Sequence, residues 1–267
     1  MVPICLQVIL LFQMLTNISP FARTDLHCSS ALSQKPRFRP LNLPSSKSPQ
    51  DSSLVSPGPD LTESSKRYES QALEKFPAGE HCLDWTLRHI RDLSSTLQFI
   101  RRSSILPEEN VWYSDKVYYL QHCLLEIVHS PRCTPLDTAF SIAALIFCAI
   151  CFRDINFRFR AVADAVPRIQ NSLRDLQTDY FPFNDAQFAT RTFWVLVFGG
   201  MAAEGKQDRP WFVEKLRISS EILGFRSWTT AKVVLEDVLW QSKLDEYGSR
   251  LWREVVDRTR EAGLFAF

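Results

Sequence analysis

Apolar residues recur at helical spacing after about residue 80. From residue 83 to 100 they step by three or four positions, which places them on one face of a helix. Arg88, Arg91 and Asp92 lie off that face, so this helix is predicted to pack on one side and meet water on the other. Its apolar face comprises Leu83, Leu87, Ile90, Leu93, Leu97 and Ile100.

Three further helices are predicted in the middle of the chain. One has Ser114 as its expected N-cap. The next begins at Thr134-Pro135-Leu136-Asp137, where the threonine can cap free amides, the proline suits the first position and the aspartate favours the positive helix end. Pro167 is expected to kink the third. The first buries Val117, Leu120, Leu124 and Ile127, and the third carries Val162, Val166, Ile169, Leu173 and Leu176.

The last third of the chain predicts helices at about 185–203, 209–223, 228–240 and 245–261. Gly224 is placed to end one of them, and Ser227 to cap the next. No glycine occurs between Gly79 and Gly199, and we find neither an alternating strand pattern nor an internal repeat. The fold class predicted is therefore all-α, with seven or eight packed helices over residues 80–267.

Upstream of this domain the amino-acid composition of the chain changes twice. Residues 29–79 are predicted to be a disordered Pro/Ser-rich linker, because six of the 15 prolines fall between 29 and about 66 among many serines. Residues 1–28 hold an apolar stretch of signal-peptide length and the sequon Asn17-Ile18-Ser19, but no Lys or Arg precedes that stretch. A signal peptide or anchor, a plain helix and a wrongly assigned start of the reading frame all stay open.

Composition and charge narrow the function classes. Of the 267 residues, 45% are hydrophobic and 23% charged, which is typical of a soluble globular protein. The formal net charge is +1, so no overall field draws the chain to nucleic acid, an anionic membrane or an acidic substrate.

The cysteine pattern does not indicate a redox or metal site. Cys148 and Cys151 form a CxxC pair, but they sit in the apolar run AFSIAALIFCAICF, residues 139–152. Thiolates need polar, partly exposed surroundings, so buried thiols in a core helix are the favoured interpretation. The run is also shorter than the roughly 20 residues of a membrane span.

The search for catalytic chemistry finds one constellation. His122, Glu126 and His129 fall on one helical face at spacings that could ligate zinc. No fourth ligand suggests itself, so a solvated polar face is the favoured interpretation. No GxSxG, GxGxxG, GxxxxGK[ST] or HExxH motif occurs, and no catalytic residue, metal or cofactor is expected.

Basic and aromatic residues alternate at one place, where Arg153, Arg158 and Arg160 lie among Phe152, Phe157 and Phe159. Such interleaving could hold single-stranded nucleic acid. The neighbouring Asp154 and Asp164 and the low net charge favour a solvated helix end instead. The other aromatic residues are expected to pack in the core.

Four segments in a fixed order carry a family resemblance: FWVLVFGGMAAE (193–204), RPWFVEKL (209–216), LGFRSWTTAKVVLEDVLW (223–240) and LWREV (251–255). This order resembles the fungal-specific transcription factor domain, the C-terminal regulatory region of fungal zinc-cluster transcription factors. The upstream HIRDLSSTLQFIRR and DKVYYLQHCLLEIVHS are similar to earlier parts of that region, so the resemblance spans about residues 85–256.

The residues that carry the resemblance are interpreted as structural. Each glycine of Gly199-Gly200 costs a helix about 1 kcal/mol, so the pair is expected to admit a close neighbour, Trp211 or Trp228. Asp208 is the expected N-cap of the following helix. Three tryptophans spaced by twelve residues are expected on successive helices. The whole set is Trp194, Gly199, Gly200, Pro210, Trp211, Phe212, Trp228, Trp240 and Trp252.

The sequence departs from the family at its DNA-binding module. The resemblance implies an N-terminal cluster of six cysteines holding two zinc ions, whereas the N-terminal part here holds the widely separated Cys5, Cys28 and Cys82. Either an exon is missing, or the protein acts through partners, and no direct DNA binding is expected.

The function expected is a non-catalytic transcriptional regulator of the nucleus or cytoplasm. It would act through protein partners, other transcriptional regulators, or through repacking around an effector of unknown chemistry. A secreted or membrane-anchored helical protein is the alternative. An enzyme with a helical active site would rest on the His122, Glu126 and His129 face.

Overall fold

The computed structural model describes residues 83–103, 107–174, 186–261 and 263, with the helical backbone alone for 98–103 and 107–115. These residues form α4 (Leu83–Ser103), α5 (Pro107–Val128), α6 (Pro135–Arg153), α7 (Arg160–Arg174), α8 (Ala186–Ala202), α9 (Arg209–Ile222), α10 (Trp228–Val238), the 3-10 turn η3 (Ser242–Leu244) and α11 (Asp245–Glu261). No strand occurs in these ranges, so the predicted all-α class is confirmed.

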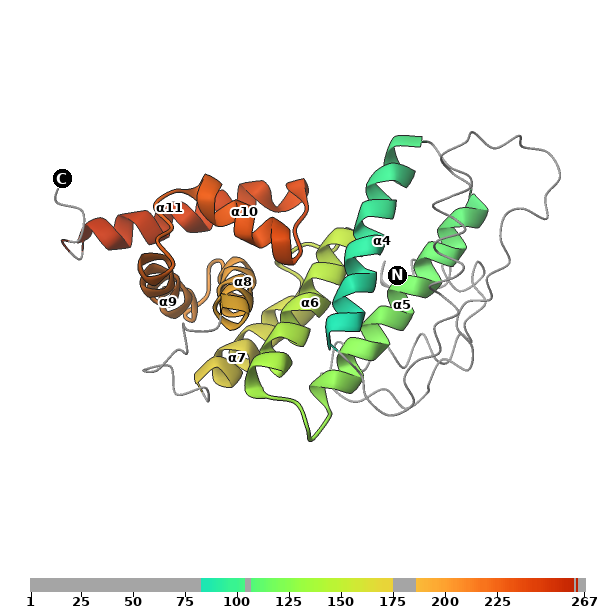
Figure 1. Ribbon diagram of the computed structural model, residues 1–267, viewed down its shortest axis with the longest axis horizontal. Helices are drawn as coiled ribbons and strands as arrows, with labels where there is room; N and C mark the ends of the chain where they lie inside the picture. The colour runs from blue at the N-terminus through green and yellow to red at the C-terminus, as the bar shows by residue number, and fades with distance from the viewer. Residues whose placement is uncertain (1–82, 104–106, 175–185, 262, 264–267) are drawn as a thin grey trace, which may run out of the picture.

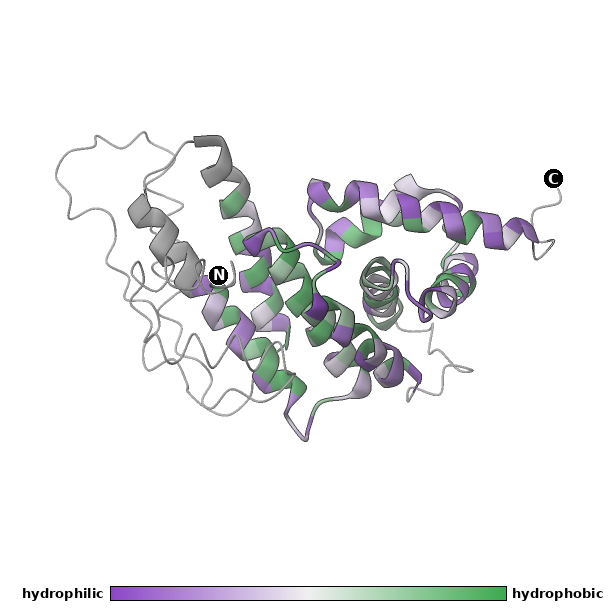
Figure 2. Ribbon diagram, turned by 180° about the vertical axis from the view of Figure 1, so that it is seen from behind, coloured by the Kyte–Doolittle hydropathy of each residue, from purple (hydrophilic) through white to green (hydrophobic). Residues whose placement is uncertain are grey.

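Two apolar helices, α6 and α8, form the centre of the domain. α6 packs against α4, α5, α7 and α8, and α8 in turn packs against α7, α9, α10 and α11. In Figure 1, α4, α5 and α6 lie on one side of the molecule and α8 to α11 on the other. Figure 2 shows hydrophobic residues predominating on α6, while α11 carries many hydrophilic ones. A helix that is apolar all round has to be buried all round, which explains the positions of α6 and α8.

The apolar stripes predicted from periodicity are buried as expected. Those of α4, α5 and α7 lie in one core cluster, as far as their side chains are described. Ile100 and Leu176, which were assigned to the same stripes, lie outside the described side chains.

Several helix ends also follow the sequence. Thr134 Oγ1 accepts a hydrogen bond from Asp137 N (3.1 Å), and Asp137 Oδ2 accepts one from Thr134 N (3.3 Å), which makes a capping box at the start of α6. Ser227 and Thr230 form the same arrangement before α10. Gly224 follows α9 with φ +72°, a conformation that glycine adopts without steric cost.

One predicted helix start and one predicted capping bond are wrong. α5 begins at Pro107 and not after Ser114, because Pro107 suits a first helical position and Glu108 and Glu109 favour the positive end of the helix. Asp208 precedes α9 but makes no capping hydrogen bond with its side chain. Pro167 lies inside α7, which continues to Arg174.

By length and composition, α6 is the one helix in the described part of the chain that could cross a membrane, but 72% of its apolar window is buried inside the protein. It is a core helix, as the sequence predicted. Cys148 and Cys151 on it are buried, and burial raises the pKa of Cys148 far above that of an exposed thiol.

The segment of residues 237–245, from the end of α10 to the start of α11, joins the two sides of the domain. Arg91 of α4 donates to the carbonyl oxygens of Asp237 (3.0 Å) and Val238 (2.7 Å). Lys243 donates to the carbonyl oxygen of Ile150 at the end of α6 (2.6 Å). Trp194 Nε1 of α8 donates to the buried carbonyl oxygen of Leu239 (2.7 Å). Arg91 of α4, Trp194 of α8 and Lys243 of η3 therefore satisfy backbone carbonyl groups at or near the ends of α6 and α10.

The Trp194 bond gives a test of this joining segment. Replacing Trp194 with Phe removes the donor, leaves the Leu239 carbonyl buried and opens a small cavity, so we expect the free energy of unfolding to fall by about 2–4 kcal/mol. Trp211→Phe is the matched control, because Trp211 is only partly buried, and should cost less than about 1 kcal/mol. Urea denaturation followed by circular dichroism measures both, and equal losses would contradict the role assigned to Trp194.

Candidate functional site

The residues that carry the family resemblance meet where α8, α9, α10 and α11 pack together. Trp194, Gly199 and Gly200 lie on α8, and Pro210, Trp211 and Phe212 lie in the first turn of α9. Trp228 begins α10, Trp240 follows it and Trp252 lies on α11. We call these nine residues, with Arg209, Gly248 and Leu251, the tryptophan–glycine joint.

The two neighbouring glycines of α8 each admit a different helix. The ring of Phe212 occupies the space that a Cβ atom of Gly199 would need, and a Cβ atom at Gly200 would lie 2.8 Å from Leu251 Cδ2. The close approach predicted for this pair is therefore real. The neighbours predicted, Trp211 and Trp228, are wrong, because Phe212 is the residue of α9 that points into the core.

A third glycine contact was missed by sequence reasoning. A Cβ atom at Gly248 of α11 would overlap the ring of Trp228 and lie 3.1 Å from Trp240 Cη2. The Trp228 ring lies 5.7 Å from that of Trp240 and 6.4 Å from that of Trp252. Trp228 and Trp252 lie on different helices, as predicted, whereas Trp240 lies in the segment after α10 and on no helix. The three rings converge beside Gly248. A glycine inside a helical pattern, four residues before Trp252, was the signal that could have found it.

Arg209 connects three of these helices and was also missed. Its side chain is buried, donates to the carbonyl oxygen of Gly200 on α8, and binds Glu254 of α11 through Nε (2.9 Å) and Nη2 (2.7 Å). A two-pronged guanidinium–carboxylate pair fixes orientation as well as distance. Arg209 therefore holds the start of α9 against the end of α8 and the middle of α11.

Other polar groups at the joint are likewise engaged with one another. Trp240 Nε1 donates to Asp245 Oδ1 (2.8 Å), and Lys232 Nζ donates to Asp245 Oδ2 (2.7 Å). At the outer edge, the guanidinium of Arg174 lies 5.7 Å from the centre of the Trp211 ring. The arrangement fixes how four helices pack, and these contacts assemble no nucleophile with a base.

The His122, Glu126 and His129 face is not the solvated face that was favoured. His122 and Glu126 are each 6% exposed, and His129 is half-buried. No group of three or more His, Cys, Asp or Glu side chains in the described ranges is placed to hold a metal ion. The solvated interpretation failed because periodicity identifies the apolar side of a helix and does not show whether the polar residues on its other sides are buried too.

The interleaved basic and aromatic stretch divides between core and surface. Phe152 and Phe157 are buried, whereas Phe159, Arg158 and Arg160 are exposed. The guanidinium of Arg153 lies 3.9 Å from the centre of the Tyr118 ring on α5. This stretch is the end of α6 and the start of α7, and it does not present a row of stacking rings for nucleic acid.

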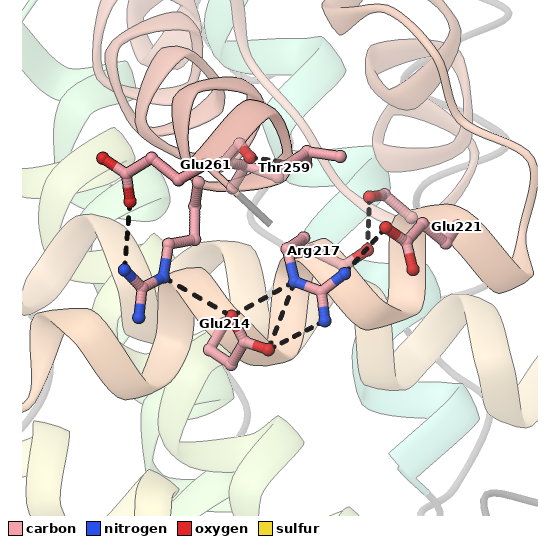
Figure 3. A network of polar contacts seen from close by, with 8 residues as sticks. Glu214, Arg217, Glu221, Thr259 and Glu261 are labelled. Carbon is pink, nitrogen blue, oxygen red and sulfur yellow. Dashed lines mark hydrogen bonds and ion pairs between the residues drawn. The ribbon is translucent and has the colours of Figure 1, made fainter. Parts of the chain in front are cut away.

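The outer side of α9 and α11 carries a network of ion pairs. Arg217 donates to both carboxylate oxygens of Glu214 (2.8–3.2 Å) and to Glu221 (2.7 Å), as Figure 3 shows. Arg258 of α11 lies 3.7 Å from Glu214. Hydrogen bonds from Arg217 hold the pKa of Glu214 below its ordinary value, and the same bonds raise the pKa of Arg217.

Comparison with known proteins gives one match. The family model described as the fungal-specific transcription factor domain matches residues 21–266, which is most of the chain and includes every described helix. The match begins well upstream of the domain start predicted near residue 80. No curated protein and no solved structure matches.

The Gly199 contact predicts an unusual response to alanine. Alanine favours a helix over glycine by about 1 kcal/mol, but at Gly199 its methyl group would strike the rigid, buried ring of Phe212. We expect Gly199→Ala to destabilise the protein by about 1–2 kcal/mol net in urea denaturation. Gly200→Ala, which meets the movable end of Leu251, should cost less, and adding Phe212→Leu to Gly199→Ala should recover part of the loss. A stabilised Gly199→Ala variant would show that the contact is looser than described.

The Glu214–Arg217 pair predicts that the stability of the protein depends on pH in the acid range. Because its pKa is lowered in the folded state, ionised Glu214 adds stability above its ordinary pKa, 4.5, and that stability is lost as the pH falls through the lowered value. Arg217→Ala should shrink the fall in unfolding free energy between pH 6 and pH 3, by less than about 1 kcal/mol because the pair is partly exposed. Arg260→Ala removes the same charge from an exposed position and should leave the acid dependence nearly unchanged. An equal effect of both variants would assign the dependence to net charge.

Proposed function

Since the chain belongs to the fungal-specific transcription factor domain family, we propose that it is a regulator of transcription in fungi that works in the nucleus through protein contacts and not through catalysis. The family match over residues 21–266 is the observation that carries the proposal. The residues behind the resemblance support it, because they are engaged in helix packing. A protein whose shared residues maintain a fold acts through the surface that the fold presents.

The proposal includes that this chain does not read DNA through a zinc cluster. Such a cluster needs six thiolates, and the sequence has seven cysteines. Three of them, Cys123, Cys148 and Cys151, are buried in the helical core, and burial raises the pKa of Cys123 to about 12. Four cysteines are then left for six positions. The net charge of +1 adds no general attraction to DNA.

Partner binding is proposed as the mechanism, since the described surface is mixed in charge. The α9–α11 face presents paired carboxylates and guanidinium groups, which resemble the polar rim of a protein interface more than a basic track for phosphates. Repacking around an effector is the second way in which such a domain could respond. Either mechanism would act through the joint, where four helices are held by a few contacts.

The secreted or membrane-anchored alternative rests on residues 2–15 and the sequon, which lie outside the described residues. No observation on the described helices favours it. Recovery of the protein solely from the medium, or its sensitivity to glycosidase, would support that alternative.

A tethering experiment tests the proposed function. The full chain is fused to an unrelated DNA-binding domain in a fungal cell that carries a reporter with the matching sites. We expect reporter transcription to change several-fold relative to the DNA-binding domain alone, because the fused chain brings its partners to the promoter. Affinity capture of the untethered chain should then recover transcription proteins.

The matched control is Gly248→Leu, which drives a side chain into Trp228 and Trp240 and should abolish the effect. A fusion that is folded and nuclear yet leaves the reporter unchanged, with no transcription protein captured, would contradict the proposal.

A further inference from the structure

The connection between α5 and α6 protrudes from the helical domain. Figures 1 and 2 both show it at the lower edge of the molecule, beyond the ends of the two helices. It contains Ser130-Pro131 and Thr134-Pro135, the two pairs of a hydroxyl residue and a following proline in the described part of the chain. Both prolines, Arg132 and Thr134 are exposed, and Ser130 is half-buried.

A hydroxyl residue followed by proline is the group that proline-directed protein kinases phosphorylate. Proline has no backbone N–H, so it fits an apolar pocket beside the acceptor in which any other residue would leave an N–H group unpaired. The described chain has no cis peptide bond, and a residue before proline avoids the helical conformation. Both pairs therefore have the covalent chemistry that such a kinase requires.

The structure distinguishes the two hydroxyl groups by what must open before an enzyme can bind them in an extended chain. Thr134 Oγ1 donates to Asp137 Oδ2 (2.7 Å) and accepts from Asp137 N (3.1 Å) in the capping box of α6. Extending the chain beyond Thr134 would unwind the first turn of α6 and expose the buried Leu136. The fold therefore protects the Thr134 hydroxyl.

Ser130 is held by one surface turn. Its Oγ atom accepts an exposed hydrogen bond from Arg132 N (3.3 Å), and its carbonyl oxygen accepts one from Cys133 N (3.3 Å). The Cys133 thiol also hydrogen-bonds with the Ser130 side chain. These contacts all lie within residues 130–133, and α6 begins only at Pro135. The turn can thus open without unwinding α6.

We propose that Ser130 is a phosphorylation site for a proline-directed protein kinase and that Thr134, in the same kind of pair, is not. Ser130 Oγ forms a bond to the γ-phosphorus of ATP, the bond from that phosphorus to the oxygen shared with the β-phosphate breaks, and ADP leaves. The hydroxyl proton passes to a base of the kinase. The phosphoserine carries a charge of about −1.5 to −2, and the exposed Arg132, two residues on, brings a cation close to it.

This modification needs only the exposed turn, so it does not depend on the proposed role in transcription. The full-length chain is incubated with ATP and a purified cyclin-dependent or mitogen-activated protein kinase, and mass spectrometry follows the phosphate at each residue over time. We expect Ser130 to react at least about tenfold faster than Thr134, a ratio that corresponds to about 1.4 kcal/mol. The exposed Ser242, which Lys243 follows, should stay unmodified. Absence of phosphate at Ser130, or equal rates at Ser130 and Thr134, would overturn the proposal.

Two variants separate the protection by the fold from the preference of the kinase for serine or threonine. Thr134→Ser keeps a capping hydroxyl and makes both acceptors serine, and Ser130 should still react about tenfold faster. Pro131→Ala keeps the Ser130 hydroxyl but adds an N–H group, so phosphorylation of Ser130 should slow by about tenfold. Loss of the difference in Thr134→Ser, or an unchanged Ser130 rate in Pro131→Ala, would contradict the assignment.

The chain isolated from growing fungal cells provides the last measurement. Trypsin cleaves after Lys116 and Arg132, so Ser130 lies in the peptide of residues 117–132. We expect this peptide to carry a phosphate that phosphatase removes and that the Ser130→Ala variant lacks. A peptide without phosphate would show that cells do not use the site.

Discussion

Burial of α8 on all sides is the constraint on which the rest of the helical domain depends. α8 packs against α6, α7, α9, α10 and α11, and every residue from 192 to 202 on it is buried. Two consequences follow from such a position. Neighbouring helices must approach closely, which Gly199 and Gly200 allow, and each polar atom that α8 brings inside needs a partner. Leu239 supplies one through its carbonyl oxygen and Arg209 another through its guanidinium group. The helices that flank α8 are therefore fixed both by shape and by hydrogen bonds.

Much of this fold could be predicted from the sequence, because helix formation leaves local signals. The starts of α6, α9, α10 and α11 agree with prediction, and the capping residues Thr134 and Ser227 do what their types suggest. The errors occur at residue types that are common both at helix caps and at other positions. Ser114 can cap a helix or lie inside one, and Asp208 precedes a helix without capping it. Periodicity identifies only the apolar face of a helix. It could not show that His122 and Glu126, which lie off the core stripe, are also buried.

The joint was harder to predict than the helices, because its contacts connect residues far apart in the sequence. The glycine pair of α8 showed that some neighbour must come close, but nothing local separates Phe212 from Trp211 as that neighbour. Arg209 pairs with Glu254 on a different helix. Nothing in the sequence around Arg209 indicates this partner. Gly248 was overlooked since a glycine near the start of a helix has several ordinary explanations. Resemblance to a family drew attention to these residues, whereas their contacts required the structure.

A domain of this kind needs no constellation of reactive groups in order to regulate. Its two sides, α4 to α6 and α8 to α11, are connected through the contact of α6 with α8 and through the segment of residues 237–245. Arg91 and Trp194 bind carbonyl groups of this segment, and its own Lys243 binds the end of α6. Packed helices change between discrete arrangements and do not deform smoothly, because interiors are close-packed. A partner that favours one arrangement of α9 and α11 must therefore act through the same few contacts that fix the fold. Under the proposed function, residues such as Gly199 and Arg209 would then be structural and functional at once.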